Sequence, residues 1–453
     1  MTSPNSLDLT VLEQVLRAVA SVAAINQICD ELKVKRRKEI YTVPVVIWLM
    51  IYQRLQCKGT LSAAVHFLVR HAVHWQDRAG ACKRVVEQRI SSSTGRYCQA
   101  RLQLLTLVVI HVCDHIFEQL QQQMRVPPLE VGRPVFIMDG TTLRLSHEAE
   151  LKRAFPPGRN QYGENHWPTM LMVVFHDAQT GLAMRPSWGA MYGKNNVSEQ
   201  QLAREALGRL PADAIAMADA NFGIFWFAHE AHRSQRDMLL RLTEPRAHSI
   251  LQGERLRVAS RRKVQWRAST WDRKHHADVP AEAVVTGWVV ACRHPQNREE
   301  ILYFFTTLDL QPKHILAIYK LRWNVETDLR HLKRTLDLHQ ITAKSKAMVE
   351  KEVLMAVCAY NVVRAVMYLS ATAAGLSPRQ ISFSAAQDAV MAAWPYLERA
   401  RNQAEFQSEI ERLLVVVARH VLPKRSSKRS YPRAIWNRGD KFPLRRSEEK
   451  GVD

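Results

Sequence analysis

Three carboxylates stand where their side chains can act together. Asp139 and Asp219 each follow an apolar run that predicts a buried strand, Val135–Met138 and Ala214–Ala218 respectively. An α/β sheet presents ligands where such strands emerge at its carboxyl edge. If the two strands are neighbours, the aspartates come close together, and Glu326 can complete the set from a helix. Each aspartate taken singly is as readily explained as a helix cap or turn residue.

Glu326 lies on a polar ridge of the helical segment Ile318–Leu338. At about 100° per residue, Tyr319, Arg322 and Lys333 fall beside it. A carboxylate flanked by cations suits a phosphate-handling site, since the carboxylate binds a metal and the cations face the non-bridging oxygens. Taken alone, the pattern more often marks an exposed face with an Arg–Glu pair. The apolar stripe expected to face the core is Ile318, Leu321, Val325, Leu329, Leu332 and Leu336.

The three carboxylates predict a site for two divalent metal ions. Close carboxylates repel one another strongly unless cations neutralise them. Oxygen ligands of this kind suit Mg²⁺ or Mn²⁺. Two such ions can activate a water or hydroxyl and stabilise the leaving oxygen of a phosphodiester. We therefore predict metal binding by Asp139, Asp219 and Glu326.

Composition places these residues in a basic globular protein. The 453 residues carry a formal net charge of +21, which indicates a polyanionic partner. A hydrophobic content of 47% excludes general disorder. No apolar run approaches the roughly 18 residues of a membrane span, and no secretion signal is evident, so we expect a cytoplasmic protein. The seven cysteines form no Cys-x-x-Cys pair and predict no zinc site.

Periodicity predicts an α/β fold flanked by helices. Helical patterns occupy the N-terminal part, strands alternate with helices after it, and a β-rich stretch precedes a second helical part. In detail we expect a helix over Leu7–Val22, another over Tyr97–Gln123, a strand over Leu182–Trp188 and a loop over Asp272–Asp278. The predicted regions are helical 1–130, core 131–247, β-rich 248–308, core 309–375, and a helical 376–453 with a basic tail, Lys424–Lys450.

The motifs together resemble those of a known family. Tyr319, Arg322, Glu326 and Lys333 fit the Tyr-x2-Arg-x3-Glu-x6-Lys signature of bacterial insertion-sequence DDE transposases, in the insertion-sequence-four-like group. Met-Asp-Gly-Thr at 138–141 is similar to the first catalytic block of that family, and Ala-Asp-Ala-Asn-Phe-Gly at 218–223 to the second. The resemblance extends to the early basic and apolar stretch, Lys351–Met367 and the tail, so it covers nearly the whole chain.

The resemblance implies a ribonuclease-H-like catalytic core with a β-rich insertion between Asp219 and Glu326. It also implies that Asp139, Asp219 and Glu326 bind the metals, whereas Tyr319, Arg322 and Lys333 hold DNA phosphates near the transposon end. One departure is Ala220, where the family often has arginine. Two ends must be joined, so we expect double-stranded DNA as partner and a homodimer on it, with end recognition by the helical region 1–130.

The leading hypothesis is a cut-and-paste DNA transposase that cleaves terminal inverted repeats and joins the 3′-hydroxyl to target DNA. One alternative is a catalytically inactive DNA-binding remnant or transposition inhibitor, although the three intact carboxylates argue against it. Another is a structure-selective nuclease, which leaves the N-terminal module unexplained. Trp266, Trp271 and Trp288 can stack on an extruded base, but each is more simply explained as packing a small β-layer.

Overall fold

The protein is described here by a computed structural model. It describes residues 21–35, 39–56, 59–71, 82–87, 89–124, 126, 129–161, 163–295, 297 and 299–423. The predicted helix Leu7–Val22 lies almost wholly outside the described residues. The basic tail Lys424–Lys450 and part of the early basic stretch, residues 36–38, also lie outside them.

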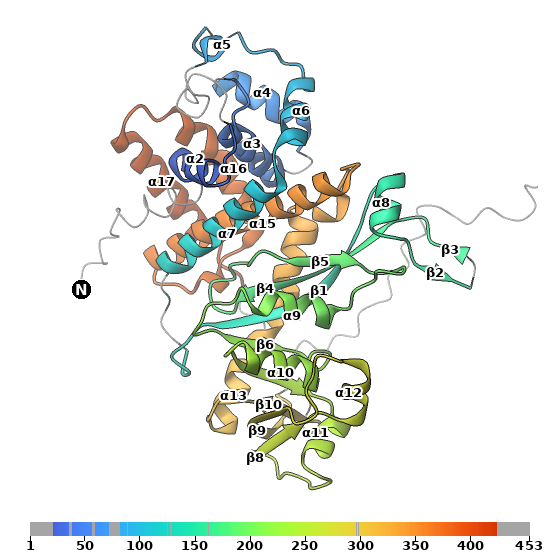
Figure 1. Cartoon of the computed structure of the whole chain (residues 1–453). Helices are drawn as coiled ribbons and strands as arrows, with labels where there is room; N and C mark the ends of the chain where they lie inside the picture. The colour runs from blue at the N-terminus through green and yellow to red at the C-terminus, as the bar shows by residue number, and fades with distance from the viewer. Residues whose placement is uncertain are drawn as a thin grey trace, which may run out of the picture. The chain divides into compact units, whose positions relative to one another are not determined.

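One eight-stranded mixed sheet carries the fold (Figure 1). Its strands are β1 (Val135–Arg144), β4 (Thr169–Asp177), β5 (Ser187–Ala190), β6 (Ile215–Ala218), β7 (Asp237–Leu242), β8 (Ser260–Arg267), β9 (Val284–Arg293) and β10 (Ile301–Thr306). They lie in the order β5-β4-β1-β6-β7-β10-β9-β8. The β1–β6 and β6–β7 pairs are parallel, and the other pairs are antiparallel. A separate small hairpin pairs β2 (Arg159–Asn160) with β3 (Gly163–Glu164).

The β-rich stretch predicted at 248–308 continues this sheet. Its three strands, β8, β9 and β10, join the rest because β10 pairs antiparallel with β7. Apart from α15, which is described below, nine α-helices of the described residues lie between and after the strands. They are α8 (Ala149–Ala154), α9 (Glu199–Leu207), α10 (Phe225–Arg233), α11 (Glu244–Ile250), α12 (Thr270–His275), α13 (Pro312–Tyr319), α14 (Trp323–Arg330), α16 (Phe383–Arg399) and α17 (Gln403–Ala418). The predicted mixed α/β class is confirmed.

Two local predictions in this region are wrong. The strand expected over Leu182–Trp188 begins only at Ser187, because the residues before it are irregular and pair with β4 only through an isolated bridge between His176 and Ala183. The loop expected over Asp272–Asp278 begins inside helix α12. Ser269 and Asp272 form a capping box that stabilises its first turn. In the sequence, this capping pair is not distinguishable from the other polar residues around it.

The described N-terminal part is helical. Its elements are α2 (Val22–Glu31), α3 (Val43–Leu55), α4 (Leu61–His71), α5 (Lys83–Val86), α6 (Gly95–Gln103) and α7 (Thr106–Gln123). The single helix expected over Tyr97–Gln123 is two helices at 81° to each other. Leu104 and Leu105 adopt extended backbone angles, which end α6 and start α7.

A long apolar helix, α15 (Lys346–Ala373), packs against α3, α7, α16 and α17 (Figure 1). Contrary to the expectation that no apolar run approaches the length of a membrane span, α15 is long and apolar enough to cross a membrane. The same is true of the α6–α7 pair if it is counted as one bent span. The apolar window of α15 is entirely buried inside the protein, however, which is typical of a core helix.

Lys351 and Glu352 on α15 join it to the N-terminal helices. Burial, with a contribution from Arg101, lowers the pKa of Lys351 to about 8, so the amine stays protonated at neutral pH. Its Nζ donates hydrogen bonds to the carbonyls of Arg101, Leu102 and Leu104, at 2.8, 3.1 and 2.8 Å. The carboxylate of Glu352 accepts from Arg54 and Arg101. Lys351 therefore satisfies carbonyls that the bend between α6 and α7 leaves open.

We expect Lys351→Met to lower the free energy of unfolding by about 2–4 kcal/mol. Methionine keeps the length of the side chain but donates no hydrogen bond, so buried carbonyls lose their partner. Urea denaturation measures the change. Lys344→Met is the matched control, because that ammonium is exposed in its pair with Glu148. An unfolding free energy equal to that of the control would contradict the role given to Lys351.

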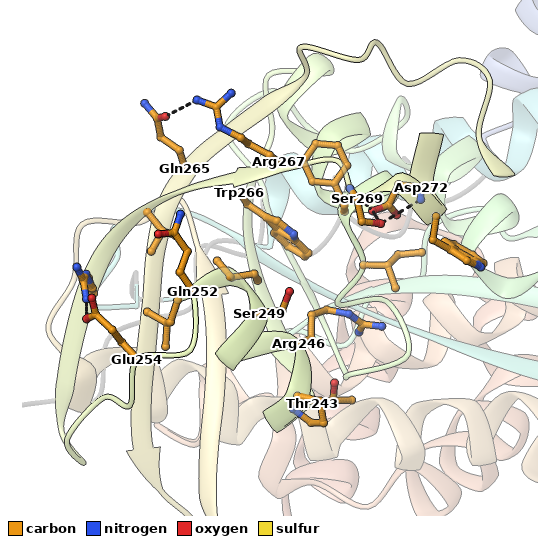
Figure 2. Close-up of a pocket in the computed structure, with 18 of the residues that line it drawn as sticks. Thr243, Arg246, Ser249, Gln252, Glu254, Gln265, Trp266, Arg267, Ser269 and Asp272 are labelled. Carbon is orange, nitrogen blue, oxygen red and sulfur yellow. Dashed lines mark hydrogen bonds and ion pairs between the residues drawn. The ribbon is translucent and has the colours of Figure 1, made fainter. Parts of the chain in front are cut away.

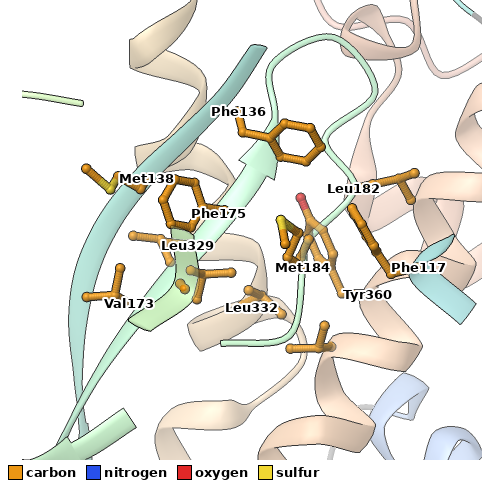
Figure 3. Packing of buried hydrophobic residues seen from close by; sticks show 14 of the residues in the cluster. Phe117, Phe136, Met138, Val173, Phe175, Leu182, Met184, Leu329, Leu332 and Tyr360 are labelled. Carbon is orange, nitrogen blue, oxygen red and sulfur yellow. The ribbon is translucent and has the colours of Figure 1, made fainter. Parts of the chain in front are cut away.

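The core behind the sheet is formed by side chains from β1, β4 and the helices. Figure 3 shows Phe136 and Phe175 from the two strands beside Leu329 of α14 and Tyr360 of α15, with Phe117 of α7 at one side. Phe136, Phe175 and Tyr360 are fully buried. This packing holds α14, the helix that carries Glu326, against β1.

Candidate active site

Asp139 and Asp219 are brought together by the register of β1 and β6. The parallel pairing matches Val135 with Ile215 and Ile137 with Met217. The same offset, continued past the end of β6, sets Asp139 beside Asp219. Neighbouring strands lie about 4.8 Å apart, so the two residues emerge side by side.

Asp139 does not end its strand as predicted. β1 continues to Arg144, because its pairing with β4 extends from Phe136–Asp177 through Arg144–Thr169. The strand that ends near Asp139 is β6, which pairs with β1 on the side opposite β4 and stops at Ala218. The aspartate therefore lies in mid-strand, where β1 loses its partner on one side.

The segment Ile318–Leu338 is an irregular helix rather than a continuous one. α13 passes through a 3-10 turn, Lys320–Arg322, into α14, which ends in a π-helical turn, His331–Thr335. The predicted apolar stripe is nevertheless on the core side. Its buried members are Ile318, Val325, Leu329, Leu332 and Leu336, and Leu321 is partly buried.

The four signature residues differ in exposure. The side chain of Glu326 is 56% exposed, and its Oε1 accepts a hydrogen bond from Nη2 of Arg322 at 3.0 Å. Arg322 is buried, with its guanidinium 4.5 Å from the ring centroid of Trp323. Tyr319 packs on Phe304, and among the described residues its hydroxyl has no hydrogen-bond partner of good geometry. Burial lowers the pKa of Lys333 and raises that of Tyr319.

The carboxylates lie within electrostatic reach of one another. Burial is the main cause that raises the pKa of Asp139, and the charges of Asp219 and Glu326 raise it further. The backbone N–H of Gly140, which donates to Asp139 at 2.8 Å, and the Arg322 charge act in the opposite direction. The predicted trio thus shares one electrostatic environment with an excess of negative charge.

The carboxylate oxygens of Asp139, Asp219 and Glu326 suit a divalent cation, although the three side chains do not converge on one point. In the described part of the chain, no three His, Cys, Asp or Glu side chains are grouped closely enough to hold a metal ion. Mutual repulsion and the pairing of Glu326 with Arg322 account for this spread. The residues offer hard oxygen ligands and uncompensated charge, which favour Mg²⁺ or Mn²⁺.

Glu199 is a further carboxylate at this site that the sequence analysis missed. It is the first residue of α9, and it lies against Gly140. Burial, then the charges of Asp139 and Asp219, raise its pKa. Only the pattern Ser198-Glu199-Gln200-Gln201, a helix start just beyond β5, signals it, and many surface helices begin that way.

Comparisons with known proteins identify the family of this chain. Residues 130–362, just over half of the chain, match the family model described as the transposase DDE domain. The chain belongs to the DDE transposase family. Over 344 residues, 74% of each chain, it is 24% identical to the transposase InsG for insertion sequence element IS4 of Escherichia coli (strain K12). The predicted resemblance is confirmed, and the mixed sheet is consistent with a ribonuclease-H-like core.

The loop after Asp219 is held by an arginine from another part of the transposase. Nη1 of Arg246 on α11 donates to the carbonyls of Gly223 and Ala220, at 2.7 and 3.4 Å. Gly223 is needed for close approach, since a Cβ there would lie 2.1 Å from the backbone oxygen of Arg241. An arginine thus contacts this loop although residue 220 itself is alanine.

Arg246 also lines an open pocket of about 840 Å³ between α11, α12 and β8 (Figure 2). Trp266 lies in its wall, buried, with its ring edge-on to Phe305. For Trp266 the packing explanation therefore holds. Trp271 is exposed and stacks on His275, whereas Trp288 lies beneath the guanidinium of Arg261.

A buried ion network anchors the far side of α14. Asp328, which is inaccessible to solvent, accepts hydrogen bonds from Arg364 of α15 and from Arg379, the latter at 2.7 and 2.8 Å. Arg379 also donates to the carbonyls of Asp177 and Ala178. The transposase thereby fixes the helix that carries Glu326 to the turn after β4.

Proposed function

We propose that this transposase cleaves the ends of its element by metal-dependent hydrolysis and joins the freed 3′-hydroxyl to target DNA. The proposal is supported above all by the register that sets Asp139 beside Asp219 at the end of β6. Glu326 contributes to the same electrostatic environment from α14. We assign the three carboxylates as the metal-binding and catalytic residues.

Bound Mg²⁺ or Mn²⁺, as two ions, would activate the attacking oxygen and stabilise the leaving oxygen. Asp139, Asp219 and Glu326 would hold these ions, and the Arg322 guanidinium would face a phosphate once Glu326 turns toward the metals. Lys333, in the π-helical turn after α14, would add a second cation, and Tyr319, the last residue of α13, would add a hydroxyl. The hydroxyl of Tyr319 is buried in this structure, so its contact with a phosphate would require that it become exposed on DNA binding.

We further propose double-stranded DNA as partner, both as element end and as target. The net charge of +21 supports a polyanion, and the helical region 1–130 is the candidate for end recognition. A homodimer on DNA follows from the need to bring two ends together. A cytoplasmic, nucleoid-associated location agrees with such substrates.

The decisive experiment uses the purified full chain and a labelled fragment that carries the end of its own element. Incubation with Mg²⁺, with Mn²⁺ or with EDTA should give nicking at the end only with metal, and Asp139→Ala should abolish it. A tight complex without cleavage in any metal would instead favour a non-catalytic DNA-binding protein.

A stability measurement tests the metal site without DNA. The pKa of Asp139 is raised in the folded state, so its protonated carboxyl contributes stability at low pH. This contribution is lost as the pH rises through the folded pKa, because ionisation then destabilises the folded state. In EDTA at neutral pH, Asp139→Asn should therefore raise the unfolding free energy by about 0.5–2 kcal/mol. Mn²⁺ should raise the melting temperature of the wild type more than that of the variant. The exposed Asp388→Asn on α16 is the control, and an equal Mn²⁺ response in all three proteins would contradict the site.

A further inference from the structure

Gly140, which follows Asp139, and Asn221, two residues after Asp219, both contact the side chain of Glu199. On one side, Glu199 occupies the space beside Gly140. A Cβ built on Gly140 would lie 2.1 Å from Oε1 of Glu199 and 2.4 Å from its Cδ. Gly140 lies in an ordinary strand region, so space rather than backbone strain requires glycine there. The Gly140 N–H in turn donates to Oδ1 of Asp139 at 2.8 Å.

On the other side, Glu199 holds Asn221. Oε2 of Glu199 accepts a hydrogen bond from Nδ2 of Asn221 at 2.6 Å, a short bond assisted by the carboxylate charge. Gln200, the next residue of α9, donates from Nε2 to the side-chain and backbone oxygens of Asn221, at 2.9 and 3.1 Å. The backbone N–H of Asn221 donates to Oδ1 of Asp219 at 2.9 Å. The first turn of α9 therefore fixes the residue that orients Asp219.

The start of α9 is itself well defined. Ser198 caps the helix, and its capping box with Gln201 fixes the first turn in which Glu199 stands. α9 packs on β4 and β5, which belong to the same sheet as β1. α9 thus holds Glu199 rigidly against two segments, those of Gly140 and Asn221. The sheet itself does not connect these segments beyond the end of β6.

We propose that Glu199 is a positioning residue that fixes the spacing of Asp139 and Asp219 through Gly140 and Asn221. This inference rests on the proposed function, and it explains why glycine follows the first aspartate. Misplacement of a reacting group by about 1 Å can cost about 10²-fold in rate. Loss of the Glu199 side chain should therefore impair cleavage although Asp139, Asp219 and Glu326 remain.

The test is a mutant cycle in the full-length protein with Glu199→Ala, Gly140→Ala, the double variant and Glu199→Gln. We expect each single alanine variant to lower the rate of end nicking in saturating Mn²⁺ by about 10- to 100-fold. Gly140→Ala should act by displacing the Glu199 side chain, so it should add less than about twofold in the Glu199→Ala background. Glu199→Gln should stay within about fivefold of the wild type, because its amide oxygen still accepts from Asn221.

Two controls keep the measurement specific. Glu205→Ala removes an exposed carboxylate from the same helix, and Gly208→Ala adds a methyl group where no heavy atom lies within 4 Å. Both should cleave like the wild type. Melting temperatures of all variants, and the Mn²⁺ concentration at half-maximal stabilisation, supply readouts that do not depend on activity.

Three outcomes would overturn the proposal. Additive effects of Gly140→Ala and Glu199→Ala would exclude coupling between the two positions. A Glu199→Gln variant as impaired as Glu199→Ala, with a raised Mn²⁺ midpoint, would make Glu199 a metal ligand instead. Unchanged cleavage by Glu199→Ala would overturn the positioning role alone. Absence of metal-dependent cleavage by the wild type would instead overturn the proposed function, so the two failures are distinguishable.

Discussion

Glu326→Gln should reduce end cleavage by about 10³- to 10⁴-fold while end binding stays within about twofold of the wild type. Glutamine has nearly the size of glutamate but a neutral amide, which is a poor ligand for Mg²⁺. The side chain is largely exposed, so no core packing is disturbed. Single-turnover nicking and equilibrium binding to the same labelled fragment measure the two quantities.

The exposed Glu118→Gln on α7 is the matched control, since it makes the same chemical change far from α14 in the sequence. A variant of Glu326 that loses binding and cleavage in equal proportion would show that the residue supports structure or DNA contact, and the assigned site would then be wrong. Full binding with lost cleavage would assign the carboxylate to chemistry.

Asp328→Ala should destabilise the transposase by about 3–5 kcal/mol, the largest stability effect that we expect from one substitution. The change leaves the guanidinium groups of Arg364 and Arg379 without their shared carboxylate in a buried place, and uncompensated buried charges are costly. Denaturant unfolding of the free protein measures it. Asp388→Ala, on the exposed face of α16, should change the free energy by less than about 0.5 kcal/mol. Equal stabilities of the two variants would contradict the network.

The same carboxylate gives the network a defined pH dependence. Burial alone would raise the pKa of Asp328, but Arg379 and Arg364 lower it to about 2, from an ordinary value of 3.8. Its contribution to stability is therefore complete above pH 3.8 and is lost as the pH falls toward 2. The wild type should lose more unfolding free energy over this window than Asp328→Asn does, which unfolding curves at several pH values would reveal.

The sequence predicted the parts of the site that depend on residue type and periodicity. Short apolar runs located β1 and β6, and the helical stripe correctly gave the core side of α14. The sequence placed Asp139 near Asp219 only on the condition that their strands are neighbours, because strand order depends on contacts between residues distant in the chain. The register of β1 with β6 supplies that missing condition.

What the sequence did not reveal depends on tertiary partners. The bend between α6 and α7 has no glycine or proline to signal it, and its free carbonyls are satisfied by Lys351, some 250 residues later in the chain. Glu199 resembles any acidic residue in a first helical turn until Gly140 and Asn221 are placed around it. The 3-10 and π turns around α14 likewise follow from packing rather than composition.

The position of β8 at the end of the sheet has a consequence for self-association. An open edge strand offers unpaired backbone groups to any other strand, which makes it a template for aggregation. The exposed side chains along β8 include Lys263 and Arg267, and also Arg262, which is paired with Glu254, so a second copy of this edge would meet the positive charges of Lys263 and Arg267. Electrostatic repulsion therefore disfavours pairing of this edge with the same edge of a second copy.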